Sequence, residues 1–239
     1  MSLKTSPFST MKSIAIVLAR SGSKRIPGKN TRLFRERPMM AWPLQAALDS
    51  GLFDEVMVST DGPEIAELAV NMGASVPFMR SAEAASDVAT TADVLTEVLR
   101  SYGDLGQKFD LACCLYAAAP FVTIELLRQS RQILFEENFD VVMPVTSFSY
   151  PILRSLQREP GGKVAMNWPE YVQTRSQDLP AAYHDVGQFY WFRPAALARD
   201  GTLLGQNTGS VVVPESQVQD IDNEEDWLMA ELKHQRRFG

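Results

Sequence analysis

The sequence is poor in the residues that most often build metal centres and covalent cross-links. Among its 239 residues there are only two cysteines and two histidines. The cysteines, Cys113 and Cys114, are neighbours within an apolar run, so they neither bridge each other readily nor have the spacing of a metal-binding motif. We therefore expect two buried structural thiols in a reducing compartment, the cytoplasm.

Long apolar runs and a surplus of positive charge are lacking as well. No stretch approaches the roughly 20 apolar residues of a membrane-spanning helix. Residues 1–10 are polar and lack the apolar core of a signal peptide, so we expect a tag or disordered leader before one folded domain, 11–239. Lys and Arg total 23 against 29 Asp and Glu, which argues against general nucleic-acid binding. A local basic cluster can still bind an anionic ligand.

Apolar and amphipathic segments alternate along the first half of the chain. Short apolar runs that are typical of buried parallel strands lie at 14–19, 56–60, 75–78, 111–116 and 141–145. Helical patterns separate them, at 44–50, 63–72, 91–102 and 123–136. This alternation predicts an α/β fold, a mostly parallel sheet with helices on both faces and right-handed crossovers.

The pattern changes after residue 145. Residues 146–192 contain prolines and a Gly161–Gly162 pair between short β-like runs, which predicts an antiparallel insertion of hairpins and loops. Strand order resumes at 188–192 and 210–213, before a final helix over 223–233. The insertion is too small for its own core and is expected to expose apolar groups, so we expect a symmetric homodimer to cover them. These groups are Phe148, Tyr150, Ile152, Trp168 and Tyr171.

The first predicted strand runs directly into a cationic segment. Residues 20–30 (RSGSKRIPGKN) hold four cations, two glycines and two serines. Ligands of open parallel sheets bind beyond the carboxyl ends of the strands. A Gly/Ser turn lets backbone N–H groups approach a phosphate, and Arg and Lys neutralise its charge. The segment is neither a Walker loop nor Gly-x-Gly-x-x-Gly. It predicts a phosphate-binding loop, and a solvated basic loop is the alternative.

A second chemical motif, Asp220-Ile221-Asp222, stands before the last predicted helix. At the end of a strand, two such carboxylates point to one side of the chain, and hard oxygen ligands of this kind suit magnesium. The alternative is helix capping, with Asp222 and Glu225 as a capping box, and both roles can coexist. His234 lies in a basic tail, where we expect it to be solvated.

Residues 19–30 strongly resemble the signature of the CMP-sialic-acid synthetases. Here it stands as Ala19-Arg20-Ser21-Gly22-Ser23-Lys24-Arg25-Ile26-Pro27-Gly28-Lys29-Asn30, and the resemblance continues through essentially the whole chain from residue 11. Residues 58–61 are similar to the end of the family's second strand, and 80–91 to its cytosine-binding loop. Three segments are most similar to the branch of the family that acts on pseudaminic acid, namely 53–61, 174–179 and 183–191.

The resemblance implies an enzyme that joins CTP to a nine-carbon acidic sugar and releases pyrophosphate. It implies a nucleotide-binding α/β sheet, a dimerisation insertion and magnesium held by Asp220 and Asp222. The catalytic residues that it implies are Arg20, Lys24, Asp220 and Asp222. The nucleotide-binding residues are Ala19, Arg20, Gly22, Ser23, Lys24, Lys29, Asn30, Arg80, Ala89 and Thr91. The sugar-binding residues are Tyr116, Arg175, Gln177, His184, Asp185, Gln188 and Tyr190.

The identity of the sugar stays open between pseudaminic, neuraminic and legionaminic acids. From another class, a catalytically silent nucleotide-binding protein of the same fold is a weaker reading, because the cationic loop and the Asp-x-Asp motif are both intact. The family's Pro-Thr-Ser/Ala-Pro turn stands here as Ala117-Ala118-Ala119-Pro120. We therefore expect one hydrogen bond to sugar or nucleotide to be missing.

Overall fold

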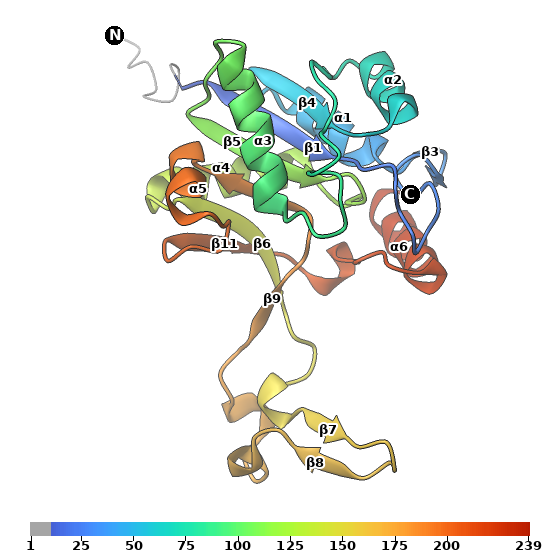
Figure 1. Cartoon of the computed structure of the whole chain (residues 1–239). Coiled ribbons are helices and arrows are strands. Elements are labelled where there is room, and N and C mark those ends of the chain that lie inside the picture. Colours follow the sequence, from blue (N-terminus) through green and yellow to red (C-terminus); the bar gives the residue numbers. More distant parts are fainter. Residues whose placement is uncertain (1–10) are drawn as a thin grey trace.

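A computed structural model describes residues 11–239 (Figure 1). Its central sheet has the strand order β11-β6-β10-β5-β1-β4, with β9 paired to β6. Strand β1 is parallel to β4 and β5, and β11 is parallel to β6, whereas β10 is antiparallel to both its neighbours. The strands are β1 (Ser13–Leu18), β4 (Glu55–Ser59), β5 (Leu111–Tyr116), β6 (Val141–Ser147), β9 (Tyr183–Asp185), β10 (Phe189–Phe192) and β11 (Thr208–Val212).

Helices cover both faces of this sheet, which confirms the predicted α/β fold. Along β1, Ala15 and Val17 join the core under one helical layer, while Ile14 and Ile16 join the core under the other. One layer contains α1 (Ala41–Ser50), α2 (Pro63–Asn71) and α4 (Ile124–Glu136). The other contains α3 (Thr91–Asp104) and α5 (Pro194–Asp200), and α6 (Glu224–Phe238) packs separately. Within residues 11–239, no helix is long and apolar enough to cross a bilayer.

Two elements differ from the sequence-based prediction. The run 75–78 is not a strand, since only Ser75 bridges to Met57 of the edge strand β4. Pro77 has no N–H to donate, which limits pairing there. Helix α5 was not predicted, although Pro194 begins it and Gly201 ends it with a left-handed φ of 64°. Both signals are typical helix boundaries.

An arm made of residues 148–182 extends away from the sheet (Figure 1). It leaves after β6 and returns through β9, which pairs with β6 in antiparallel register. Its side chains include exposed Tyr150, Leu156 and Val164. The last strand of the predicted insertion, β10, lies inside the central sheet. The arm's elements are η1 (Ile152–Arg154), β7 (Leu156–Arg158), β8 (Val164–Met166), η2 (Pro169–Tyr171) and η3 (Ser176–Asp178).

The C-terminal helix packs over the small hairpin of β2 (Leu33–Phe34) and β3 (Arg37–Pro38). This packing makes the prediction of a solvated His234 wrong. The side chain is 2% exposed, with ring contacts to Phe34, Trp42, Phe121 and Phe238. Burial lowers its pKa to about 4, so the ring is neutral near pH 7. Cys113 and Cys114 are fully buried, as predicted, and free.

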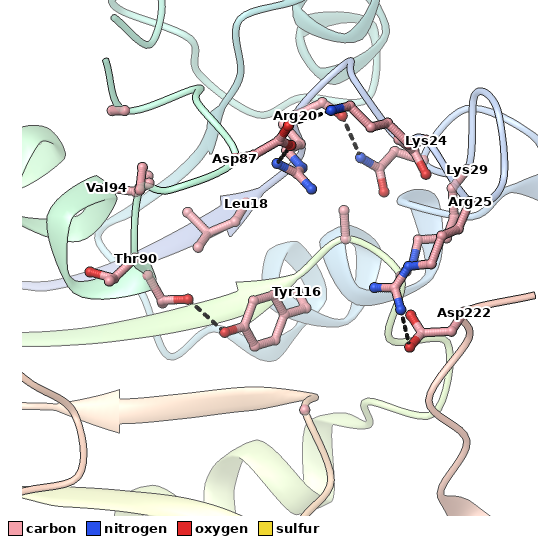
Figure 2. Close-up of a pocket in the computed structure, with 18 of the residues that line it drawn as sticks. Leu18, Arg20, Lys24, Arg25, Lys29, Asp87, Thr90, Val94, Tyr116 and Asp222 are labelled. Carbon is pink, nitrogen blue, oxygen red and sulfur yellow. Dashed lines mark hydrogen bonds and ion pairs between the residues drawn. The ribbon is translucent and has the colours of Figure 1, made fainter. Parts of the chain in front are cut away.

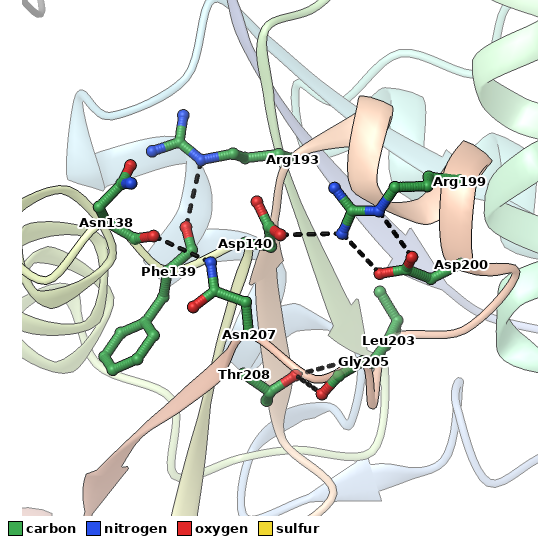
Figure 3. A network of polar contacts seen from close by, with 10 residues as sticks. All are labelled: Asn138, Phe139, Asp140, Arg193, Arg199, Asp200, Leu203, Gly205, Asn207 and Thr208. Carbon is green, nitrogen blue, oxygen red and sulfur yellow. Dashed lines mark hydrogen bonds and ion pairs between the residues drawn. The ribbon is translucent and has the colours of Figure 1, made fainter.

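A polar network braces the sheet at the amino end of β6 (Figure 3). The guanidinium of Arg199 lies 2.9 Å from Asp140 and also pairs with Asp200. Arg193 donates to the carbonyl of Phe139, and Asn207 donates to that of Asn138. Because β6 runs parallel to β5, this network lies at the amino ends of the parallel strands, opposite the carboxyl ends of β1 and β5. We therefore assign this network a structural role.

Candidate active site

A cavity of about 750 Å³ opens at the carboxyl ends of β1 and β5 (Figure 2). The loop after β1, the loop before α3 and the segment before α6 all contribute to it. The predicted residues that line it are Arg20, Ser23, Lys24, Lys29, Asn30, Arg80, Ala89, Thr91, Tyr116, Asp185, Tyr190, Asp220 and Asp222. It is also lined by residues that were not named individually as site residues. Arg25 belongs to the predicted phosphate-binding loop, Asp87 and Thr90 to the predicted cytosine-binding loop, Ala117 and Ala118 to the altered turn, and Gly187 follows β9.

Two cations of the loop after β1 converge on one carboxylate. The guanidinium of Arg20 lies 3.0 Å from Asp87 Oδ1, and Lys24 Nζ lies 2.5 Å from Asp87 Oδ2 (Figure 2). The hydrogen bond from Lys24 and the charges of both cations lower the pKa of Asp87. These three side chains are between 44% and 78% exposed, so an incoming anion can reach them and compete with Asp87.

The other two cations tie the same loop to the Asp-x-Asp motif. Arg25 lies 2.5 Å from Asp222 Oδ2, and Lys29 Nζ donates to the carbonyl of Ile221 at 2.7 Å. Burial lowers the pKa of Lys29, although the nearby charges of Asp222 and Asp220 oppose that effect. The cationic loop and the two carboxylates therefore form one continuous wall of the cavity.

The setting of the Asp-x-Asp motif differs from the prediction in two ways. The motif lies in an irregular segment after η4 (Glu215–Gln217), not at the end of a strand. The capping box of α6 is made by Asn223 and Asp226, not by Asp222 and Glu225. Asp222 contributes its backbone N–H, which donates to Asp226 at 2.9 Å. The carboxylate of Asp222 is thus not used as a helix cap.

Two tyrosines form an aromatic wall of the cavity. The rings of Tyr116 and Tyr190 meet edge to face, with centroids 5.9 Å apart. Tyr116 exchanges a hydrogen bond with Thr91, and Tyr190 donates to Asp185, which also accepts from the N–H of Gly187. Burial raises the pKa of Tyr116 to about 12 and that of Tyr190 further. Both hydroxyls therefore stay protonated near pH 7.

A family model described as Cytidylyltransferase matches residues 14–197. The chain belongs to the cytidylyltransferase family. Pseudaminic acid cytidylyltransferase of Campylobacter jejuni is 35% identical over 93% of this chain and 96% of its own length. N-acylneuraminate cytidylyltransferase A of Danio rerio is 33% identical over 94% of this chain and 51% of its own. CMP-N,N'-diacetyllegionaminic acid synthase of Legionella pneumophila is 39% identical over 52% of this chain and 53% of its own.

The fold of this cytidylyltransferase is also found among solved structures. CMP:2-keto-3-deoxy-manno-octonic acid synthetase, solved in complex with CTP, superimposes with a TM-score of 0.68 at 18% identity. The superposition covers 95% of this chain and 100% of that chain. The likeness confirms the α/β fold with a mostly parallel sheet.

Several predicted residues lie away from the cavity of this cytidylyltransferase. Arg175 and Gln177 belong to the arm, at η3. His184 contacts the ring of Phe148 at the base of the arm, and the amide of Gln188 donates to the carbonyl of Gln217. Ala19 is buried in the core, and Gly22 lies on the loop without lining the cavity.

Two of the predicted nucleotide-binding side chains are held by hydrogen bonds to neighbouring residues. The guanidinium of Arg80 is buried and donates to the hydroxyl and the carbonyl of Ser59, at 3.0 and 2.7 Å. Asn30 Nδ2 donates to the carbonyl of Arg20 at 2.9 Å. Both side chains still line the cavity, so their remaining polar atoms are available to a ligand.

Proposed function

We propose that this enzyme transfers CMP from CTP to pseudaminic acid, a nine-carbon acidic sugar, and releases pyrophosphate. One observation carries the proposal: a single cavity joins a loop of four cations, two carboxylates and an aromatic wall. The relative with the named activity that matches nearly end to end supports this choice of sugar. N-acetylneuraminic and legionaminic acids are the alternatives, because relatives named for those sugars also match.

In the proposed reaction, the anomeric oxygen of the sugar forms a bond to the α-phosphorus of CTP. The bond from that phosphorus to the bridging oxygen breaks, pyrophosphate leaves with the electron pair, and the sugar hydroxyl gives its proton to solvent. Such a transfer depends mainly on alignment and on neutralising charge. Arg20, Lys24 and Lys29 bind phosphate oxygens. Arg20 and Lys24 release their ion pairs with Asp87 when they bind the phosphate.

The carboxylates of Asp220 and Asp222 fit a magnesium ion. Both line the cavity beside the cationic loop, and magnesium commonly binds one or two carboxylates together with substrate phosphates and water. Within residues 11–239, no group of three or more His, Cys, Asp or Glu side chains is placed to hold a metal ion. When bound, magnesium would neutralise phosphate charge and help to align the α-phosphate and the leaving group.

The choice of sugar makes a direct prediction. Pseudaminic acid has fewer hydroxyls than neuraminic acid, and the Ala117-Ala118 stretch and the tyrosine wall offer apolar contacts there. We expect kcat/KM with CTP to be at least about 10-fold higher for pseudaminic than for N-acetylneuraminic acid. Measuring both sugars at the same magnesium and CTP concentrations tests this. Equal efficiencies would contradict the assignment to pseudaminic acid. If CTP releases no pyrophosphate with any acidic sugar, the result would favour a catalytically silent nucleotide-binding protein.

We also propose that the enzyme is a cytoplasmic homodimer whose arm reaches the partner's cavity. The arm exposes apolar side chains, and Arg175 on it can bind a sugar carboxylate in a bidentate way. Arg175→Ala and Asp222→Ala variants should each be inactive with the sugar. Mixed in equal amounts after unfolding and refolding, they should regain about a quarter of wild-type activity, because half of the dimers are mixed and each has one complete site.

Refolded single variants are the control for this mixing experiment. If the arm serves its own cavity, every chain in the mixture stays defective and no activity returns. A monomer in sedimentation at micromolar concentration with full activity would also contradict the proposal. The buried free thiols Cys113 and Cys114 support a reducing compartment.

A further inference from the structure

A carboxylate outside the cavity holds the cationic loop from behind. Asp61 follows β4, the strand next to β1, and accepts two hydrogen bonds from Ser21. Its Oδ1 accepts from the backbone N–H at 2.8 Å, and its Oδ2 accepts from the hydroxyl at 2.7 Å. Asp61 lines a second cavity, of about 260 Å³, behind the loop, and the hydrogen bonds of its side chain to the loop are those from Ser21.

The peptide unit between Arg20 and Ser21 is held at both of its polar atoms. Its carbonyl oxygen accepts from Asn30 Nδ2 at 2.9 Å, and its N–H donates to Asp61. Because a peptide unit is planar, fixing both atoms fixes its rotation. That rotation sets the direction in which the Arg20 side chain leaves the backbone, while the N–H of Ser23 donates to the carbonyl of Ser21 at 3.0 Å within the same turn.

The turn after β4 also limits how far the loop can retreat. A Cβ atom added at Gly62 would lie only 3.0 Å from the Cβ of Ser21, so the two backbones approach closely. Burial alone would raise the pKa of Asp61, but the hydrogen bonds from Ser21 outweigh it and the pKa is lowered. The carboxylate is therefore ionised near pH 7 and acts only as an acceptor.

We propose that Asp61 is a positioning residue, which orients the Arg20–Ser21 peptide so that Arg20 and the other cations of the loop meet the phosphates of CTP. This inference rests on the proposed function. It differs from a purely structural role because it concerns phosphate binding alone. Cytidine, which lacks phosphate, should bind independently of Asp61, whereas pyrophosphate should depend on it.

Two conservative substitutions separate geometry from charge. Asp61→Asn loses the charge but keeps the shape, since its oxygen can accept from the Ser21 N–H and its amide can donate to the hydroxyl. Asp61→Glu keeps the charge but places the carboxylate one methylene too far out. We expect the dissociation constant of magnesium pyrophosphate to rise about 10-fold in Asp61→Glu and by less than about 3-fold in Asp61→Asn.

The test is isothermal titration calorimetry on each full-length variant. It measures the dissociation constants of magnesium pyrophosphate and, separately, of cytidine. Cytidine affinity should stay within about 2-fold of wild type in both variants, because its binding requires no phosphate contact. Asp49→Asn is the matched control, since Asp49 is an exposed aspartate on α1 whose carboxylate accepts one hydrogen bond, from the Gln45 amide. It should bind both ligands as the wild type does.

Three results would overturn the assignment. These are weaker pyrophosphate binding by Asp61→Asn than by Asp61→Glu, unchanged pyrophosphate binding in both variants, and a parallel loss of cytidine affinity. Weaker binding by Asp61→Asn would show that the charge of Asp61, not its geometry, supports pyrophosphate binding. Unchanged binding would show that Asp61 has no part in it. A parallel loss of cytidine affinity would show that Asp61 supports the fold in general. If the wild-type enzyme binds neither pyrophosphate nor CTP, the proposed function itself fails, and the positioning role fails with it.

Discussion

Asp222→Ala enzyme is expected to lose about three orders of magnitude in turnover while keeping its fold. Loss of a magnesium ligand in nucleotidyl transfer removes several kcal/mol of transition-state stabilisation, and about 1.4 kcal/mol corresponds to tenfold in rate. The fold should persist because Asp222 lies outside the core and the capping box of α6 uses Asn223 and Asp226 instead. Pyrophosphate release from CTP and sugar, with thermal unfolding in parallel, measures both properties. Asp220→Ala should behave in the same way.

Two further variants decide how Asp222 acts. Glu225→Ala removes an exposed carboxylate three residues along the same segment and should keep normal turnover. Arg25→Ala removes the ion-pair partner of Asp222. If Asp222 serves only to hold Arg25, Arg25→Ala will reproduce the whole loss. Near-normal turnover of Asp222→Ala at ordinary magnesium concentrations would exclude the metal assignment.

The second large effect is expected at the cationic loop. Arg20→Ala and Lys24→Ala should each raise KM for CTP by about 10- to 100-fold, because a charged hydrogen bond to phosphate is lost from a preformed site. The melting temperature should shift by less than about 2 °C, since both side chains are exposed and their pairs with Asp87 add little stability. Steady-state kinetics over a range of CTP concentrations tests the first statement.

Arg199→Ala provides a matched control for the loop variants. Arg199 is an exposed arginine in ion pairs with Asp140 and Asp200 (Figure 3). Asp140 immediately precedes β6, at the end of the sheet opposite the carboxyl ends of β1 and β5. It should leave KM for CTP unchanged. Normal kinetics in Arg20→Ala and Lys24→Ala, combined with a large fall in melting temperature, would support the reading of a solvated basic loop with a structural role.

The sheet could be predicted from the sequence because its signals are local. The strands β1, β4, β5 and β6 are short apolar runs, and several helices show boundary residues within a few positions, as at Thr90 and Asp93, which form the capping box of α3. The position of the cavity followed from the topology of parallel strands. The protein's membership in the cytidylyltransferase family was predicted from one long signature, residues 19–30.

The errors arose where the decisive neighbour is distant in sequence or where local charge hid the pattern. Asp87 meets Arg20 across 67 positions, which no local pattern shows. His234 was placed in solvent because Lys233, Arg236 and Arg237 surround it in the sequence. Its spacing from the buried Trp227 and Ala230 puts it on the buried face of α6. That helical periodicity was the signal that could have corrected the prediction.

The arm begins and ends on strands that are already side by side. Residues Val145–Ser147 of β6 pair with Tyr183–Asp185 of β9, so the connection between them closes on a preformed ladder. Changes in the length of such a connection cost little free energy, because loop-closure entropy grows only slowly with length. We therefore expect the arm to diverge faster than the sheet during evolution, and we expect chimeras that exchange it at these two strands to fold. Arm exchange would be a practical route to enzymes that attach CMP to unnatural acidic sugars.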